Sequence, residues 1–144
     1  MGKTLNVELL EPWQIEQFWP QIQDALLRLA HLWADKWTID YFQQAAFNQH
    51  IQVWGVGYGT RMELMAFTQV VRYPANNFFQ IMFVLGDEAW KEFSPPLIEA
   101  WHKFGATQNC RFWEAPHARV GWERRGFGKR TGIVLAGPIK QMVM

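Results

Sequence analysis

Two different patterns of hydrophobic residues meet at Gly86. Residues 78–85 form an apolar run that only Gln80 interrupts, which is typical of a strand buried on both faces. Gly86 ends the run, and apolar side chains then recur at helical spacing. This stripe comprises Trp90, Phe93, Leu97, Trp101 and Phe104. The pattern predicts a strand, a glycine turn and a helix.

Ser94-Pro95-Pro96 interrupts the predicted helix. Ser94 can cap a helix and Pro95 suits a first helical position. We therefore expect a short helical turn, followed by a longer helix that ends at Gly105.

Upstream of this stretch the pattern predicts a strand, a helical region and a hairpin. The stripe of Ile22, Leu26, Leu29, Ala30 and Trp33 predicts a helix that Pro20 opens, and Thr38 can cap a further short helix. Gly55 and Gly57 share one face of a hairpin strand, which indicates a bulge or a close backbone approach. The predicted elements are a strand at 5–10, helices at 13–19, 20–33 and from 39, and hairpin strands at 51–58 and 62–71.

Downstream, the pattern predicts a strand at 110–114, a helix at 117–125 and a strand at 131–136. No repeat or linker divides the chain, so we expect one domain over residues 1–144. The predicted fold class is α/β (α+β), with about six strands in one sheet flanked by helices.

Composition narrows the function classes. Hydrophobic residues make up 49% and charged residues 19% of the chain, and the net charge of +1 gives no pull toward nucleic acid or membrane. Nine Trp and eleven Phe exceed the needs of one small core, so we expect some rings to face a partner. No signal-peptide pattern or membrane-length apolar run is present, and we expect an intracellular protein.

The cysteine and histidines do not predict a metal site. Cys110 is the single cysteine, which excludes an internal disulfide and fits a reducing compartment. His31, His50 and His102 lack metal-ligand spacing with one another or with Cys110. Cys110 is expected to be a small core residue.

The order of the elements resembles the GNAT superfamily of N-acetyltransferases over nearly the whole chain. Three segments carry the resemblance: IQVWGVGYGTRMELMAFTQVV, FFQIMFVLGDEAWKEFSPPLIEAWHKFG and CRFWEAPHARVGWERRGFGKRTGIVLAGPI. The resemblance implies a GNAT-like domain with a mixed, mostly antiparallel sheet. More narrowly, WQIEQFWPQIQDAL and GWERRGF are similar to small GNAT-like proteins encoded among the structural genes of tailed bacteriophages.

The resemblance places the acetyl-CoA loop at Val84, Leu85 and Gly86. In the family, backbone N–H groups of a loop resembling Q/R-x-x-G-x-G/A hold the pyrophosphate. Here one glycine remains, no Arg or Gln leads the loop, and Asp87 and Glu88 occupy the expected helix start. Each carboxylate would repel a pyrophosphate at about 4 Å by roughly 1 kcal/mol in water. We therefore expect that the chain uses no cofactor, or acetyl-CoA if it is an enzyme.

The resemblance also implies a tyrosine in the last helical segment as the acid that protonates the departing thiolate. No tyrosine lies there. The candidates that remain for catalysis are His117, by its pKa near neutrality, and Glu63, as a proton relay from the middle strands.

Basic residues gather between positions 119 and 130. This cluster predicts either a solvated helix face and loop or a docking patch for an acidic protein surface or a phosphate backbone, with a tryptophan that can stack on a base or pack on a partner. Its members are Arg119, Trp122, Arg124, Arg125, Lys129 and Arg130.

Three functions follow as hypotheses. The favoured one is a catalytically degenerate GNAT-fold assembly protein, namely a phage virion or head-tail component that binds virion proteins or further copies of itself. The second is an active N-acetyltransferase that transfers acetyl from acetyl-CoA to an amine. The third is a phage-encoded modulator of a host protein. The expected location is the virion or the host cytoplasm, with no membrane or nucleic-acid partner.

Overall fold

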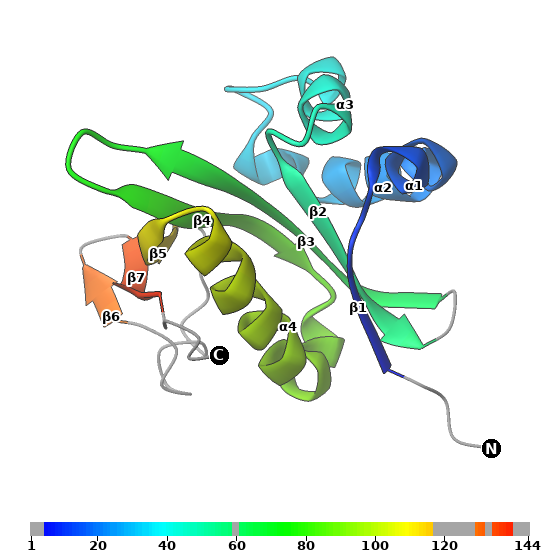
Figure 1. The fold of residues 1–144 in the computed structure, drawn as a ribbon. Coiled ribbons are helices and arrows are strands. Elements are labelled where there is room, and N and C mark those ends of the chain that lie inside the picture. Colours follow the sequence, from blue (N-terminus) through cyan, green and yellow to red (C-terminus); the bar gives the residue numbers. More distant parts are fainter. Residues whose placement is uncertain (1–4, 59–60, 117–128, 132–133, 140–144) are drawn as a thin grey trace.

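The computed structural model describes residues 5–58, 61–116, 129–131 and 134–139. Their centre is a seven-stranded sheet in the order β1-β2-β3-β4-β5-β7-β6 (Figure 1). β4 and β5 pair in parallel, and every other described pair is antiparallel. The strands are β1 Leu5–Leu9, β2 Gln52–Tyr58, β3 Arg61–Arg72, β4 Asn77–Leu85, β5 Cys110–Ala115, β6 Lys129–Thr131 and β7 Val134–Pro138. The predicted mixed, mostly antiparallel sheet is confirmed.

Helices cover both faces of the sheet (Figure 1). One face carries α1 Pro12–Gln17, α2 Trp19–Arg28, the 3₁₀ helix η1 Ala30–Leu32 and α3 Ile39–Phe47, and the other carries α4 Asp87–Thr107. The core is accordingly divided in two by the sheet. Ile22, Phe42 and Phe83 lie in the layer under α1–α3, while Phe79 and Leu97 lie in the layer under α4.

The predicted helix starts are confirmed on the first face. Pro20 lies in the first turn of α2, where its missing N–H costs no hydrogen bond. Thr38 caps α3, because its Oγ1 accepts a hydrogen bond of 3.1 Å from the backbone N of Tyr41. The long predicted helix to Trp33 ends earlier, however, at Arg28, and η1 follows it.

α4 corrects the prediction of two helical pieces. It is one helix of 21 residues with Pro95 and Pro96 inside it. Each proline removes one backbone hydrogen bond, but the buried stripe on both sides of them, from Trp90 to Trp101, packs on the same sheet and keeps the two halves in one helix.

Gly105 does not end α4, which continues to Thr107. A Cβ at Gly105 would lie 3.0 Å from Cδ1 of Ile139, so the glycine serves close packing. Asn109, in the left-handed region with φ 59°, follows the helix instead.

The β2–β3 hairpin has both features that its glycines predict. A Cβ at Gly55 would lie 2.7 Å from Sδ of Met62, so the side chain of Met62 crosses the strand closely there. The register passes from Val56↔Leu64 to Gly57↔Met62, which leaves Glu63 as an extra residue on β3. This is a β-bulge, a local insertion that re-aims side chains.

One predicted element differs from the structure, and another lies outside the described residues. The apolar run 131–136 was predicted as one strand, but Thr131 ends β6 and Val134 begins β7, and these two residues pair with each other. The predicted helix at 117–125 lies outside the described residues. No helix in the described part of the chain is long and apolar enough to cross a bilayer.

Candidate active site

The parallel strands β4 and β5 separate halfway along β4. Their pairing starts at Asn77↔Cys110 and ends at Gln80↔Glu114. β4 nevertheless continues to Leu85, still paired with β3. On the β5 side, residues 81–85 therefore have no strand partner among the residues that the structure describes. A free strand edge of this kind presents backbone N–H and C=O groups to an extended ligand.

A bulge in β4 lies directly after this separation. The pairing with β3 passes from Thr68↔Ile81 to Phe67↔Phe83, so Met82 is an extra residue on β4. Met82 and Phe83 are both buried in the layer under α1–α3. Because a bulge bends the strand that contains it, it turns β4 at the point where its pairing with β5 stops.

A polar ladder crosses three strands where β4 and β5 separate. Nε2 of Gln69 on β3 donates a hydrogen bond of 2.6 Å to Oε1 of Gln80 on β4. Nε2 of Gln80 donates one of 3.0 Å to Oε1 of Glu114 on β5. The hydroxyl of Tyr73 donates to the same oxygen at 2.7 Å. Glu114 is half-buried, and these two donors fix the orientation of its carboxylate.

The hydrogen bonds of the ladder determine which group acts as a donor and which can accept a proton. The hydrogen bond to Glu114, with smaller contributions from burial and from the Glu114 charge, raises the pKa of Tyr73 above its ordinary value of 10.0. Tyr73 therefore stays protonated at neutral pH and acts as a donor. Among the described residues no further hydrogen bond to Glu114 is present, so its second oxygen can accept a proton from a bound group.

The three residues predicted to hold a cofactor lie at the end of β4 and in the turn after it. Val84 and Leu85 end the strand, and Gly86 lies in the left-handed region with φ 114°. A Cβ at Gly86 would lie 2.6 Å from the carbonyl oxygen of Glu63 and 3.1 Å from Cα of Leu64, so only glycine fits this turn. α4 begins at Asp87, and its N-terminal N–H groups therefore follow the strand directly.

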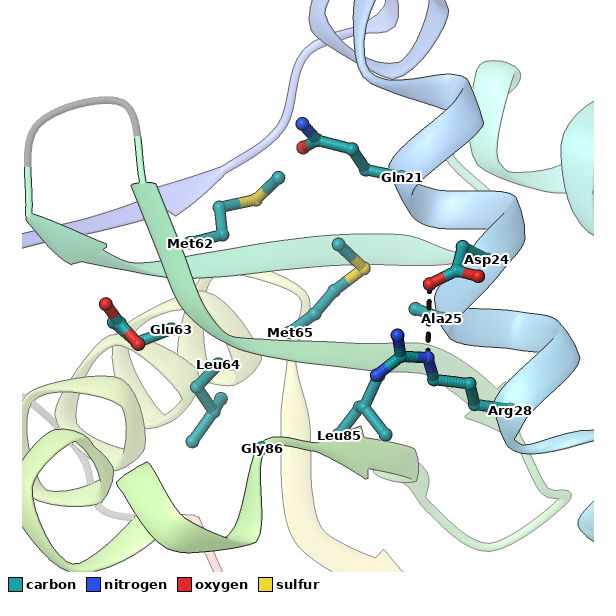
Figure 2. A pocket seen from close by; sticks show the side chains of 10 residues that line it. All are labelled: Gln21, Asp24, Ala25, Arg28, Met62, Glu63, Leu64, Met65, Leu85 and Gly86. Carbon is teal, nitrogen blue, oxygen red and sulfur yellow. Dashed lines mark ion pairs between the residues drawn. The ribbon is translucent and has the colours of Figure 1, made fainter.

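Glu63 lies beside this turn but far from Glu114. It lines a hollow of about 400 Å³ between α2, β3 and the end of β4, where Arg28 Nε and Asp24 Oδ2 form an exposed ion pair at 3.1 Å. Figure 2 shows the Glu63 carboxylate pointing away from this pair. The charge of Glu63 contributes to the raised pKa of Tyr58, after the larger effects of the Glu92 hydrogen bond and burial.

Glu63 and Glu114 cannot act on one small group. Glu63 and Gln69 are six residues apart on β3, and Gln69 contacts Gln80, the neighbour of Glu114. At the rise of a strand this spacing is about 20 Å. The structure thus brings Glu63 and Gly86 together and leaves Glu114 as a second, separate carboxylate.

Other predicted site residues have different outcomes. His117, Arg119, Trp122, Arg124 and Arg125 lie outside the described residues. Lys129 and Arg130 belong to β6 and pair with β7 at Ala136 and Leu135. Binding by this basic cluster stays a prediction.

Cys110, in contrast, is confirmed as a core residue. Burial raises the pKa of its thiol, while Arg72 acts weakly in the opposite direction. The thiol is therefore a poor nucleophile at neutral pH.

The sequence-based reasoning missed Gln80, Glu114 and Tyr73 as a group. One signal was present, because Gln80 is the single polar residue within the apolar run 78–85. A polar side chain in a buried strand needs a partner. The partner could not be named, since the parallel register of β4 and β5 depends on α4 and not on local sequence.

Comparison with solved structures identifies the fold. An aminoglycoside acetyltransferase from an uncultured soil metagenomic sample, in complex with trehalose, aligns with a TM-score of 0.65 at 13% identity, covering 97% of this chain and 93% of that one. The same enzyme in complex with sisomicin gives a TM-score of 0.63. A ribosomal-protein-alanine N-acetyltransferase from Brucella melitensis aligns with a TM-score of 0.58 at 14% identity, covering 85% of this chain and 86% of that one. No protein-family model and no curated protein sequence matches this chain.

These neighbours correct the favoured functional hypothesis. A catalytically degenerate virion component was predicted from the side chains of the cofactor loop, but the three solved structures described above, which share the fold over most of the chain, are those of acetyltransferases. The physical reason for the error is that the strand edge, the β4 bulge and the Gly86 turn are backbone features, which the loop side chains do not reveal. The chain has the fold of the GNAT N-acetyltransferases.

Proposed function

We propose that the protein is an acyl-CoA-dependent N-acetyltransferase that transfers an acetyl group from acetyl-CoA to an amine. The observation that carries this proposal is the separation of β4 and β5 at Gln80↔Glu114, with an oriented carboxylate at that point. The acetyltransferases that share the fold support it.

The backbone of β4 fits the pantetheine arm of acetyl-CoA. Residues 81–85 offer a strand edge that the described residues leave without a β5 partner, and the two amides of an extended pantetheine can pair with it. When bound, acetyl-CoA supplies the acetyl group as an activated thioester. The turn at Gly86 carries no side chain, and the N–H groups that open α4 would hold the phosphates. Asp87 and Glu88 follow Gly86 in the sequence. Negative charge near a helix N-terminus weakens phosphate binding there but leaves the backbone donors in place.

Glu114 is the general base of the proposed reaction. An amine attacks a thioester through its lone pair, so a protonated amine must first lose a proton. Oε1 of Glu114 is held by Tyr73 and Gln80, and its second oxygen takes this proton directly or through one water. Glu63 is the competing candidate, because it lies beside the Gly86 turn.

The proposal is tested by thiol release from acetyl-CoA in the presence of an amine panel. The two named neighbours suggest an aminoglycoside and a peptide with an N-terminal alanine as the first acceptors. We expect Glu114→Gln to lower kcat by about 10²-fold or more and to leave acetyl-CoA binding unchanged, with Glu63→Gln as the matched control. Absence of acetyl-CoA binding by calorimetry would overturn the proposal. Loss of activity in Glu63→Gln but not in Glu114→Gln would assign the base to Glu63 instead.

A further inference from the structure

A second hollow, of about 290 Å³, lies between α1 and strands β1–β3. In the sheet order these strands lie on the opposite side of β4 from β5, which carries Glu114. Nothing in the proposed acetyl transfer uses this hollow. Ten residues line it: Asn6, Glu8, Leu10, Trp13, Gln14, Gln17, Phe18, Gly55, Gly57 and Met62.

The floor of the hollow is formed by two glycines. Gly55 pairs with Glu8 of β1, and Gly57 pairs with Asn6. Residues directly opposite each other in an antiparallel pair project to the same face of the sheet. No β2 side chain therefore lies opposite Glu8 or Asn6, and the side chain of Met62 packs over Gly55 instead, with its Sδ 2.7 Å from where a Cβ would lie.

Two side chains at the rim are held in place before any ligand binds. Trp13 is 60% exposed, yet its Nε1 donates a hydrogen bond of 2.7 Å to Oε2 of Glu11. Oε1 of Gln14 accepts a bond of 2.9 Å from the backbone N of Glu11, and its Nε2 donates one of 3.1 Å to Oε2 of Glu8. Fixing these groups in advance lowers the entropy cost of binding.

The chemistry of the lining selects the ligand class. Glu8 is the single charged residue among the ten, so the hollow attracts no anion. Gln14 and Gln17 both donate and accept hydrogen bonds, while Glu8 accepts them from donors. The Trp13 indole offers an apolar ring face. The ligand must therefore carry hydroxyl groups around its edge and an apolar C–H face, and it must be small.

We propose that this hollow binds a single sugar ring, with the C–H face of the ring on Trp13 and its hydroxyl groups bonded to Glu8, Gln14 and Gln17. The volume lies at the small end of ligand pockets, which fits one ring and not an extended chain. The proposal does not rest on acetyl transfer, although Met62 also lines the hollow that contains Glu63.

The test uses the intact protein without acetyl-CoA. Glucose, galactose, mannose and glucosamine are titrated by calorimetry and by saturation-transfer NMR, with adenosine in the same series. We expect saturable binding of at least one hexose with a Kd below about 10 mM, and strong transfer to its ring C–H protons.

Trp13→Ala should weaken that binding about tenfold, because the stacking face is lost. The unfolding midpoint should not change, since the side chain is mostly exposed. Tyr41→Ala is the matched control, because Tyr41 is also an exposed aromatic residue, at 46%, but does not line the hollow. This variant should bind the hexose normally. Glu8→Gln provides a second variant and should also weaken binding.

Three results would overturn the proposal. One is that no hexose binds saturably. Another is that Trp13→Ala and Glu8→Gln bind as tightly as the natural protein. The third is that adenosine binds in the hollow and the hexoses do not, which would show that the hollow binds a nucleobase and not a sugar.

Discussion

The side-chain amide of Gln80 donates a hydrogen bond of 3.0 Å to Oε1 of Glu114 across the last described pair of β4 and β5. This bond joins the two strands at the point where they part. Because Gln80 is itself held by Gln69 on β3, the position of the carboxylate is determined by three strands of the sheet. A site built on strands keeps its geometry more precisely than a site on loops.

The pKa of Tyr73 should report on Glu114. The hydrogen bond raises this pKa above 10.0 in the folded protein, so it adds stability that is fully present below about pH 10 and is lost as the pH rises through the folded pKa. In Glu114→Gln the pKa should fall back toward 10.0, as measured by NMR of tyrosine ring carbons. Tyr58, whose partner is Glu92, is the internal control and should keep its raised pKa. A Tyr73 titration that does not change in Glu114→Gln would contradict the contact.

Thr68 on β3 lies in a buried chain of side-chain hydrogen bonds with β2, so its substitution should lower the stability of the protein. Its Oγ1 accepts from Nε1 of Trp54 at 2.8 Å and donates to Oε1 of Gln52 at 2.9 Å. In Thr68→Val the hydroxyl is absent, so Trp54 Nε1 and Gln52 Oε1 stay buried without this hydrogen-bond partner. We expect a loss of about 2 to 4 kcal/mol in the free energy of unfolding. Thr68→Ser keeps the hydroxyl and should cost about 1 kcal/mol for the lost methyl group. Urea unfolding of both variants checks the difference, and equal losses would contradict the prediction, because the hydroxyl would then contribute no more to stability than the methyl group.

The parts of the fold that follow from local pattern were predicted from the sequence. The run 78–85 is apolar except at Gln80 and the stripe of α4 recurs about every 3.6 residues, so the first was identified correctly as a strand and the second as helical. Pro95 and Pro96 misled the prediction because sheet packing outweighs two lost hydrogen bonds. The bulge at Met82 depends on pairing between strands and leaves no local signal, whereas Gly55 and Gly57 indicated the irregularity opposite Glu63.

The candidate site was predicted only in part for the same reason. Gly86 was identified because a glycine after an apolar run predicts a turn, and its φ of 114° confirms one. Glu114 was placed in a strand, but its role depends on Gln80, which is 34 residues away in sequence. A contact across that separation depends on the parallel crossover through α4, and periodicity does not encode it.

The acidic start of α4 should limit the affinity for acetyl-CoA. Asp87 occupies the first position of the helix, and its charge opposes a phosphate at about 4 Å by roughly 1 kcal/mol in water. We expect Asp87→Asn to lower the Kd of acetyl-CoA about fivefold by calorimetry, with a small loss of helix stability. Glu99→Gln is the charge-matched control. Glu99 lies in the same helix, two turns beyond Glu92 and therefore far from the helix start, so this variant should leave the Kd of acetyl-CoA unchanged. Equal effects of both variants would show a general charge effect and not a local phosphate site.

The turn at Gly86 should tolerate no side chain. Its φ of 114° is strained for any other residue, and a Cβ would lie 2.6 Å from the backbone oxygen of Glu63, which cannot move without breaking β3. Gly86→Ala should therefore lower the free energy of unfolding by about 2 kcal/mol or more, as measured by urea unfolding. Gly105→Ala is the matched control, because the tightest contact of its Cβ would be with the end of the Ile139 side chain at 3.0 Å, and alanine favours the helix by up to about 1 kcal/mol. If Gly86→Ala were as stable as Gly105→Ala, the close contact between the β4–α4 turn and β3 would be wrong, and with it the position of the α4 N-terminus at the proposed cofactor site.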